Sequence, residues 1–352
     1  MRRITSVSLC MIAKNEEMFL DSSLKSVKAV LGVEDMVVVD TGSTDSTKEI
    51  ALNNGARVFD FEWCDDFSAA RNFAAENAAN DWIFALDADE EVTGADLDEL
   101  DRFLKSVQTV GSATEIEMTN QEIHSASRLY NRKYYRYEGS IHEQLTPFVT
   151  PLKVIENVPI SIVHYGYLPE FKKAKGKLER NETMLKKELS ANPEDPYLLY
   201  QLGKCYFDGN WNLPGACENF EKSLKKSPDV KLEYVYSMVE CYGYALINTE
   251  QYKKALKLMN DYAKYYKNKP EFRFLSAHIY QNNGMLIEAV ECYESCIGAD
   301  MVDRRGITSY LSYYNIGVIL ELVGMKDDAI QMYISCGDYL PAVQRLSNIG
   351  KR

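Results

Sequence analysis

Four clusters of polar and acidic residues in the first hundred residues are where this sequence could do chemistry. Three of them directly follow short hydrophobic segments, and the remaining one begins a helical segment. Where hydrophobic strands end in such residues, the side chains meet at one edge of a sheet, and open α/β sheets bind ligands there. The clusters are Ala13-Lys14-Asn15-Glu16-Glu17, Asp40-Thr41-Gly42-Ser43-Thr44-Asp45, Ser68-Ala69-Ala70-Arg71-Asn72 and Asp87-Ala88-Asp89-Glu90-Glu91.

Asp87 and Asp89 could hold one hard cation, because two carboxylates flanking a small residue can reach the same ion directly or through water. A divalent ion at this position could bridge the phosphates of a nucleotide diphosphate and offset charge on a leaving group. The Asp-x-Asp pattern alone is common in solvated turns. Its position after the hydrophobic segment 82–86, together with the other three clusters, favours metal binding.

Up to about residue 170 the chain alternates between segments typical of strands and segments typical of helices. Continuous apolar strands that are joined by helices predict a mostly parallel sheet with helices on both faces, an α/β fold. The expected strands are 7–13, 35–40, 57–61 and 82–86, and the expected helices are 17–30, 43–54 and 68–79.

Beyond about residue 176 the strand pattern stops and a helical pattern repeats. Tyr280-x3-Gly284-x4-Ala289-x3-Tyr293 is matched by Leu320-x3-Gly324-x4-Ala329-x3-Tyr333. Small residues at these positions would let antiparallel helices approach closely, and the pattern resembles tetratricopeptide repeats. We therefore expect an α/β domain over residues 1–175 and an all-α domain of helix pairs over residues 176–352. A single compact helical bundle is the alternative for the second domain.

The composition is that of a folded, acidic protein. Of 352 residues, 46% are hydrophobic and 26% charged, and the net charge is −12. Such a charge disfavours binding to nucleic acid or to an anionic membrane, because both repel it. The eight cysteines form no Cys-x-x-Cys pair, as expected of reduced thiols. Because no run of about 18 apolar residues exists, we expect a cytoplasmic protein without membrane insertion.

The polar clusters, together with the segments around them, resemble the motifs of family 2 glycosyltransferases, whose fold is of the GT-A type. The resemblance holds in order and spacing over residues 1–95, in segments 8–16, 38–45, 70–72 and 86–90. It continues in Arg128-Leu129-Tyr130, Ile141-His142-Glu143 and His164-Tyr165-Gly166. A tetratricopeptide-like second domain is similar to that of bacterial enzymes that glycosylate peptides, including S-glycosyltransferases of the sublancin type.

The resemblance implies a UDP-sugar donor, UDP-glucose first, and Mn²⁺ or Mg²⁺ as cofactor. Asp40 would accept a hydrogen bond from N3–H of uracil, which selects against cytosine because that base leaves the carboxylate unpaired. Arg71 would lie near the base or the phosphates. The structural alternatives are a turn residue for Asp40 and a surface ion pair for Arg71. The remaining implied contacts are Ala13, Asn15 and Glu16 in the nucleoside pocket, Asp87 at the ribose or a metal-bound water, and Asp89 at the metal.

Two further side chains complete the expected site. His164, which follows the apolar segment Pro159–Val163, is the expected third metal ligand beside Asp87 and Asp89, with His142 as the competing candidate. A neutral imidazole suits Mn²⁺ better than Mg²⁺. Glu143 is the expected general base, which removes the proton of the acceptor. Rival carboxylates for this role are Glu90, Glu91, Asp65 and Asp66.

We therefore predict an inverting, metal-dependent hexosyltransferase that moves a sugar from a UDP-sugar to a Ser or Cys side chain of a peptide such as a bacteriocin. Residues 1–175 would be catalytic, and residues 176–352 would bind the acceptor or form a homodimer. A lipid-linked or polysaccharide acceptor is one alternative. A non-catalytic helical-repeat scaffold is an alternative of another class.

Overall fold

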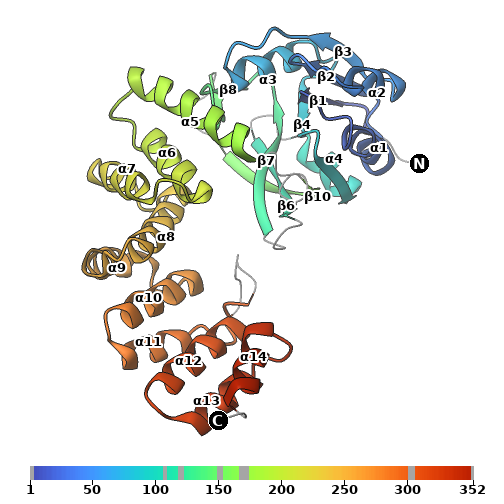
Figure 1. Ribbon diagram of the computed structural model, residues 1–352. Coiled ribbons are helices and arrows are strands. Elements are labelled where there is room, and N and C mark those ends of the chain that lie inside the picture. The colour runs from blue at the N-terminus through green and yellow to red at the C-terminus, as the bar shows by residue number, and fades with distance from the viewer. Residues whose placement is uncertain are drawn as a thin grey trace. The chain divides into compact units, whose positions relative to one another are not determined.

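The computed structural model describes residues 4–105, 109–117, 123–148, 154–165, 174–299 and 306–349. The chain divides into two compact units, residues 1–177 and residues 178–352. The first unit holds a sheet with helices, and the second contains helices throughout its described residues (Figure 1). None of the helices in the described ranges is both long enough and apolar enough to span a membrane.

An eight-stranded sheet forms the centre of the first unit, in the order β3-β2-β1-β4-β7-β6-β10-β5. The first four strands in the chain are parallel, as the sequence predicts. The other half of the sheet is mixed, because β7 runs antiparallel to both β4 and β6, and β5 runs antiparallel to β10. The strands are β1 (Val7–Ala13), β2 (Asp35–Asp40), β3 (Arg57–Asp60), β4 (Trp82–Ala85), β5 (Glu90–Ala95), β6 (Thr109–Glu117), β7 (Ile123–Asn131) and β10 (Val154–His164).

Helices cover both faces of this sheet, which confirms the predicted layers. Along β1, Leu9 and Met11 belong to the hydrophobic core that contains α1, whereas Cys10 belongs to the core that contains α3. This division follows from the alternation of side chains along a strand. The helices are α1 (Leu20–Leu31), α2 (Thr47–Asn53), α3 (Phe67–Glu76) and α4 (Leu97–Phe103), and a separate two-stranded sheet contains β8 (Tyr135–Glu138) and β9 (Gln144–Pro147).

Asp35 joins three segments at the amino ends of the parallel strands. Its carboxylate accepts hydrogen bonds from Ser8 Oγ at 2.5 Å and from the backbone N–H of Ala79 at 2.8 Å. It also accepts two hydrogen bonds from the guanidinium of Arg57, the shorter one at 2.6 Å. These contacts fix β1, β2 and β3 at the edge of the sheet opposite the polar clusters.

The second unit stacks helices in consecutive pairs, α6 with α7, α8 with α9, α10 with α11 and α12 with α13 (Figure 1). Neighbouring pairs contact each other through α7 and α8, α9 and α10, and α11 and α12, and α6 and α8 also contact the first helix of the next pair. This region is therefore a tetratricopeptide-like solenoid rather than a single bundle. The helices are α5 (Ala174–Ala191), α6 (Pro196–Gly209), α7 (Leu213–Lys225), α8 (Glu233–Asn248), α9 (Tyr252–Tyr266), α10 (Pro270–Asn282), α11 (Leu286–Glu294), α12 (Tyr310–Leu322), α13 (Lys326–Ile334) and α14 (Leu340–Ile349).

Small residues allow the helices of the solenoid to approach closely, as the repeat pattern predicts. The alanines at the repeated position are fully buried, namely Ala216, Ala255, Ala289 and Ala329. Three glycines in the interior of first helices face a side chain of another helix, namely Gly203, Gly243 and Gly317. A Cβ atom on any of them would lie 2.7 Å from a facing side chain, namely Phe220, Leu275 and Tyr333 in that order.

Candidate active site

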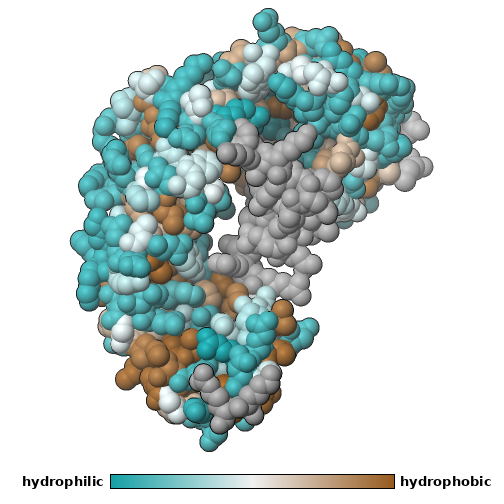
Figure 2. All heavy atoms as spheres, in the orientation of Figure 1, coloured by the Kyte–Doolittle hydropathy of each residue, from teal (hydrophilic) through white to brown (hydrophobic). Residues whose placement is uncertain are grey.

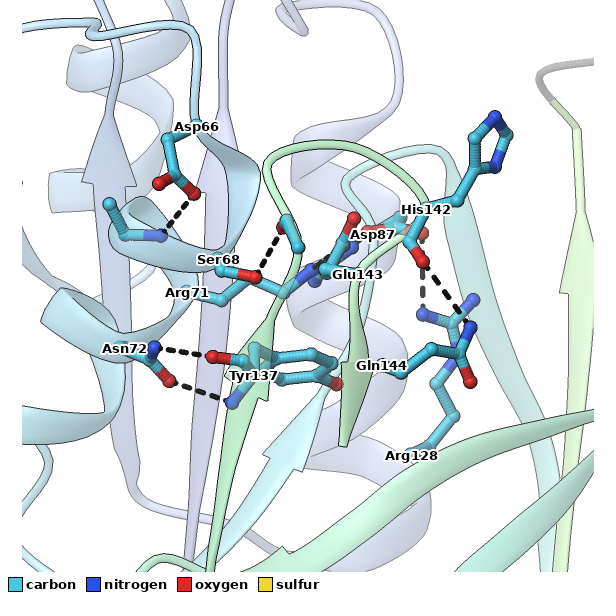
Figure 3. A network of polar contacts seen from close by, with 12 residues as sticks. Asp66, Ser68, Arg71, Asn72, Asp87, Arg128, Tyr137, His142, Glu143 and Gln144 are labelled. Atoms are coloured by element: carbon cyan, nitrogen blue, oxygen red, sulfur yellow. Dashed lines mark hydrogen bonds and ion pairs between the residues drawn. The ribbon is translucent and has the colours of Figure 1, made fainter. Parts of the chain in front are cut away.

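The polar clusters meet at the carboxyl ends of β1, β2 and β4, as the sequence predicts. The turn between β4 and β5, the end of β10 and the loop between β8 and β9 complete the site. Figure 3 shows its central contacts, in which side chains of α3 face the loop from Tyr137 to Gln144. Sequence-distant residues are therefore brought together by the sheet order.

Arg71 of α3 links two carboxylates. Its Nε donates to Glu143 Oε1 at 2.5 Å, and its Nη2 donates to Asp87 Oδ1 at 2.8 Å (Figure 3). The guanidinium also lies over the ring of Tyr137, 5.4 Å from its centroid. Only 11% of the Arg71 side chain is exposed. The structure thus gives Arg71 an ion-pair network, whereas the sequence predicts contact with the nucleotide, which stays a prediction.

Arg128 of β7 holds the other side of Asp87. Its Nη1 donates to Asp87 Oδ2 at 3.3 Å, and its Nη2 pairs with the fully buried carboxylate of Glu90. Glu90 Oε2 in turn accepts the backbone N–H of Asp87 at 2.9 Å. Both oxygens of the Asp87 carboxylate are therefore paired with guanidinium groups. In the sequence Arg128 is only part of the segment Arg128-Leu129-Tyr130, and no local pattern predicts this contact.

The two guanidinium groups set the charge state of Asp87. Burial acts to raise the pKa of this carboxyl group, but the charges of Arg71 and Arg128 outweigh burial and hold that pKa well below its usual range. Burial likewise acts to lower the pKa of Arg71, but Asp87 and Glu143 raise it well above its ordinary value. Asp87 is consequently a carboxylate at any physiological pH.

Asp89 and His164 form the part of the site that fits a metal ion. Asp89 Oδ2 lies 3.2 Å from His164 Nε2, and the backbone N–H of Tyr165 donates to Asp89 O at 3.0 Å. Two neighbouring ligands of one octahedral ion with bonds of about 2.1 Å lie about 3 Å apart, so this spacing suits a shared cation. The position of His164 results from its pairing with Glu90 where β10 meets β5.

Within the described residues, the ligand set expected for a metal ion is incomplete. Across the described ranges, no group of three or more His, Cys, Asp or Glu side chains has the arrangement of a metal centre. The predicted ligand Asp87 does not join Asp89 and His164, because its carboxylate is directed to two arginines. A cation held here would need further ligands from a diphosphate or water.

Asp40 lies at the end of β2 as a turn residue. Its oxygens accept the backbone N–H groups of Gly42 at 3.1 Å and of Ser43 at 3.0 Å, and Lys48 lies 3.5 Å away. Asp40 is 1% exposed. Asp40 therefore makes the contacts of a turn residue, and its expected hydrogen bond to uracil stays a prediction.

The loop after β1 is hydrogen-bonded to the turn after β2. Asn15 accepts the backbone N–H of Thr44 at 2.8 Å, and its own backbone N–H donates to Ser43 Oγ at 2.9 Å. The backbone N–H of Glu16 donates to Thr47 Oγ1 at 2.8 Å, and Ala13 O accepts from the backbone of Thr41 at 3.0 Å. The predicted pocket residues Ala13, Asn15 and Glu16 therefore lie beside Asp40. These contacts also explain why α2 begins at Thr47 rather than at the predicted Ser43.

Helix α3 fixes the loop that carries Glu143. Asn72 brackets Tyr137 with two hydrogen bonds, from its Nδ2 to the backbone oxygen at 2.9 Å and from the backbone N–H to its Oδ1 at 3.0 Å. Ser68 Oγ donates to Gly139 O at 2.6 Å, and the backbone N–H of Phe67 donates to the backbone oxygen of residue 140 at 2.8 Å. Sequence reasoning missed these contacts, although Ser, Arg and Asn at helical spacing i, i+3 and i+4 indicate one polar face.

The alternative candidates for the third metal ligand and for the general base have other positions. The ring of His142 points away from the Arg71 network in Figure 3. Among the rival bases, Glu90 is fully buried, Asp66 caps α3 by accepting the N–H of Ala69, and Asp65 accepts the indole N–H of Trp63. Glu91 is partly exposed on β5.

Comparisons with known proteins give the family of the first unit. Residues 8–156 match the family model for glycosyl transferase family 2. The SPbeta prophage-derived glycosyltransferase SunS of Bacillus subtilis is 27% identical over 208 residues, which cover 56% of this chain and 49% of that protein. A TPR repeat-containing protein of Synechococcus elongatus is 34% identical over 249 residues, covering 67% of this chain and 61% of that protein.

Among solved structures, the crystal structure of YrrB, titled a TPR protein with an unusual peptide-binding site, covers 52% of this chain and 88% of its own, at 21% identity and a TM-score of 0.41. The chain spans about half to three fifths of the length of the two curated relatives. The family match, the GT-A-like mixed sheet and the glycosyltransferase relative show together that this chain carries a glycosyl transferase family 2 domain.

Proposed function

We propose that this chain is an inverting, metal-dependent glycosyltransferase that moves a hexose from a UDP-sugar, UDP-glucose first, to a Ser or Cys side chain of a peptide. One observation carries the proposal, the placement of Asp89 beside His164 at the carboxyl edge of a family 2 domain. The family match supports a glycosyl donor, and the solenoid of helix pairs supports an extended peptide as acceptor.

Asp89 and His164 would hold the divalent ion, and the bound ion would offset charge on the leaving diphosphate. One carboxylate and one imidazole are a donor set that favours Mn²⁺ over Mg²⁺. Asp87 would orient the ribose or a metal-bound water without coordinating the ion, because both of its oxygens are paired with arginines. Ala13, Asn15, Glu16 and Asp40 would surround the nucleoside.

Glu143 would remove the proton of the acceptor as a general base. Its Oε1 is occupied by Arg71, whereas its Oε2 accepts no hydrogen bond from any residue within the described ranges. That second oxygen is the one that would receive the proton. A Cys acceptor would need less assistance, because part of a thiol is already ionised near neutral pH.

The helical unit would bind the acceptor peptide through partly exposed tyrosines and could also form a homodimer. Tyr197, Tyr234 and Tyr244 keep part of their surface exposed, and the rings of the first two pack 5.2 Å apart. Other tyrosines of the repeats are core residues, namely Tyr200, Tyr206, Tyr236 and Tyr242. A cytoplasmic location fits the eight cysteines, which are all free thiols.

Calorimetric titration of UDP with and without Mn²⁺ tests the nucleotide site. We expect Mn²⁺-dependent binding to the natural sequence and its loss in Asp89→Ala. Asp338→Ala is the matched control, because Asp338 is an exposed aspartate in the helical unit. A screen of UDP-sugars against peptides that contain Ser or Cys then identifies the products by mass.

Two results would contradict the proposal. UDP binding that is equal with and without Mn²⁺, or equal in Asp89→Ala, removes the metal role of Asp89. Folded protein that neither hydrolyses nor transfers any nucleotide sugar removes the enzymatic function and favours a scaffold built on the helical repeats.

For the acceptor, Tyr197→Ala should raise the KM for peptide and leave the affinity for UDP unchanged.

A further inference from the structure

The side chain of Arg71 connects two parts of the site that do different work in the proposed reaction. Glu143 belongs to the loop between β8 and β9, and Asp87 belongs to the turn that presents Asp89. Arg71 reaches the first with Nε at 2.5 Å and the second with Nη2 at 2.8 Å (Figure 3). One planar guanidinium therefore fixes the distance between the two carboxylates.

The surroundings of Arg71 are closely packed and hydrogen-bonded. Its guanidinium lies over Tyr137, which is itself 7% exposed and packs edge-on against Tyr130 at 5.5 Å. The residues of α3 on either side of Arg71 hold the backbone of the same loop, through Ser68 to Gly139 and through Asn72 to Tyr137. A guanidinium that is stacked, 11% exposed and bonded to two carboxylates has little capacity left for a diphosphate.

We propose that Arg71 is a positioning residue that holds Glu143 toward the acceptor and couples this loop to the Asp87 turn, instead of binding the nucleotide. The inference rests on the proposed function, because it takes Glu143 as the base. The fork geometry is essential here, since a lysine ammonium is a point charge and cannot bridge two carboxylates with two fixed N–H directions.

A double-mutant cycle with Arg71→Lys and Glu143→Gln tests the coupling. General bases contribute about 10²- to 10⁴-fold to rates, so Glu143→Gln should lower kcat by this factor. Arg71→Lys should lower kcat by at least about tenfold through its effect on the Glu143 carboxylate. The double variant should therefore be no slower than Glu143→Gln alone. The UDP dissociation constant in Mn²⁺ should stay within about threefold in all three variants, since none of them removes a nucleotide contact.

Hydrogen exchange of the amides of residues 139–144 is the second readout, and it does not depend on catalysis. Arg71→Lys should speed their exchange, whereas Arg136→Gln should not. Arg136 is the matched control because it is an arginine on β8 whose ion pair with Glu138 is exposed. Arg71→Lys keeps the positive charge beside Asp87 and Glu143. It therefore avoids leaving two carboxylates without a counter-charge, which could unfold the protein.

Three outcomes would overturn the inference. A UDP dissociation constant that rises about tenfold or more in Arg71→Lys at unchanged kcat makes Arg71 a nucleotide ligand. Effects of the two variants that multiply in the double variant show that Arg71 does not act through Glu143. Unchanged exchange of residues 139–144 shows that Arg71 does not hold the loop. If the natural sequence transfers no sugar, the proposed function fails by itself, and the exchange result still decides whether Arg71 fixes the loop.

Discussion

Replacing Asn72 by Ala should release β8 from α3 without unfolding the sheet. Asn72 makes two hydrogen bonds to the backbone of Tyr137, at 2.9 and 3.0 Å, and Tyr137 is 7% exposed. The substitution removes both hydrogen bonds and leaves a buried N–H and a buried C=O of the backbone without their partner. Strand β8 is especially sensitive, because its sheet has only two strands and such a sheet is marginal by itself.

The size of the effect follows from these contacts. Each hydrogen bond contributes about 1 kcal/mol net, and each buried group left without a partner costs about 1–3 kcal/mol unless water reaches it. With water reaching part of the opened strand, we expect a loss of about 2–4 kcal/mol in the local stability of β8. At 1.4 kcal/mol per factor of ten, the protection of the Tyr137 amide should fall about 30- to 700-fold.

Hydrogen exchange followed by mass spectrometry measures this change in the peptide that covers residues 135–145. Asn77→Ala is the matched control, because Asn77 follows the same helix and, among the residues that the structure describes, its side chain donates to Phe73 O alone, at 2.8 Å. It should leave the exchange of β8 unchanged. If the protection of the Tyr137 amide in Asn72→Ala stays within about threefold of that in the natural sequence, the two hydrogen bonds of the Asn72 side chain do not hold the strand. That result would refute the reasoning.

Three shorter predictions address the metal, the pH dependence and the solenoid. His164→Ala should weaken Mn²⁺-dependent UDP binding at least about tenfold in calorimetry, because even indirect partners of a metal contribute that much; unchanged binding contradicts the metal role. Burial acts to raise the pKa of Asp35, but its hydrogen bonds outweigh burial and lower that pKa. The natural sequence should therefore be more stable than Asp35→Asn near pH 7, and this difference should disappear as the pH falls below about 4 through the pKa of the folded state. Denaturant titrations at several pH values measure the difference, and a difference that does not depend on pH would refute this. Gly317→Ala should lower the Tm of the helical unit, because the new Cβ atom would clash with the buried ring of Tyr333. The clash should cost about 1–3 kcal/mol, which exceeds the gain of about 1 kcal/mol in helix propensity. A higher Tm would show that the ring can move.

The parallel half of the sheet and the solenoid were predictable, because their patterns are local. Continuous apolar strands followed by polar clusters indicate β1, β2 and β4, and small residues at a repeated interval indicate the helix pairs. The mixed half of the sheet was not predictable in the same way. Strands β6 and β7 contain polar residues such as Thr109 and Arg128 among apolar ones, so they lack a continuous apolar run.

Within the site, the meeting of Asp89 and His164 agrees with the expectation for a metal, although their role stays a prediction. The partners of Arg71 could not be derived from the sequence, because Glu143 lies 72 residues further along the chain and reaches Arg71 only through the ribbon of β8 and β9. The pairing of Asp87 with Arg128 likewise depends on β7 running antiparallel to β4. Such ion pairs depend on strand order, and local patterns do not contain it.

The glycines inside the first helices of the solenoid have a consequence for how this sequence can change over evolutionary time. Each missing Cβ is replaced in space by a side chain of another helix, so the two positions share one volume. A larger residue at a glycine position becomes acceptable only when the facing residue becomes smaller. In an alignment of related sequences, the pairs should therefore covary in size, namely Gly203 with Phe220, Gly243 with Leu275 and Gly317 with Tyr333.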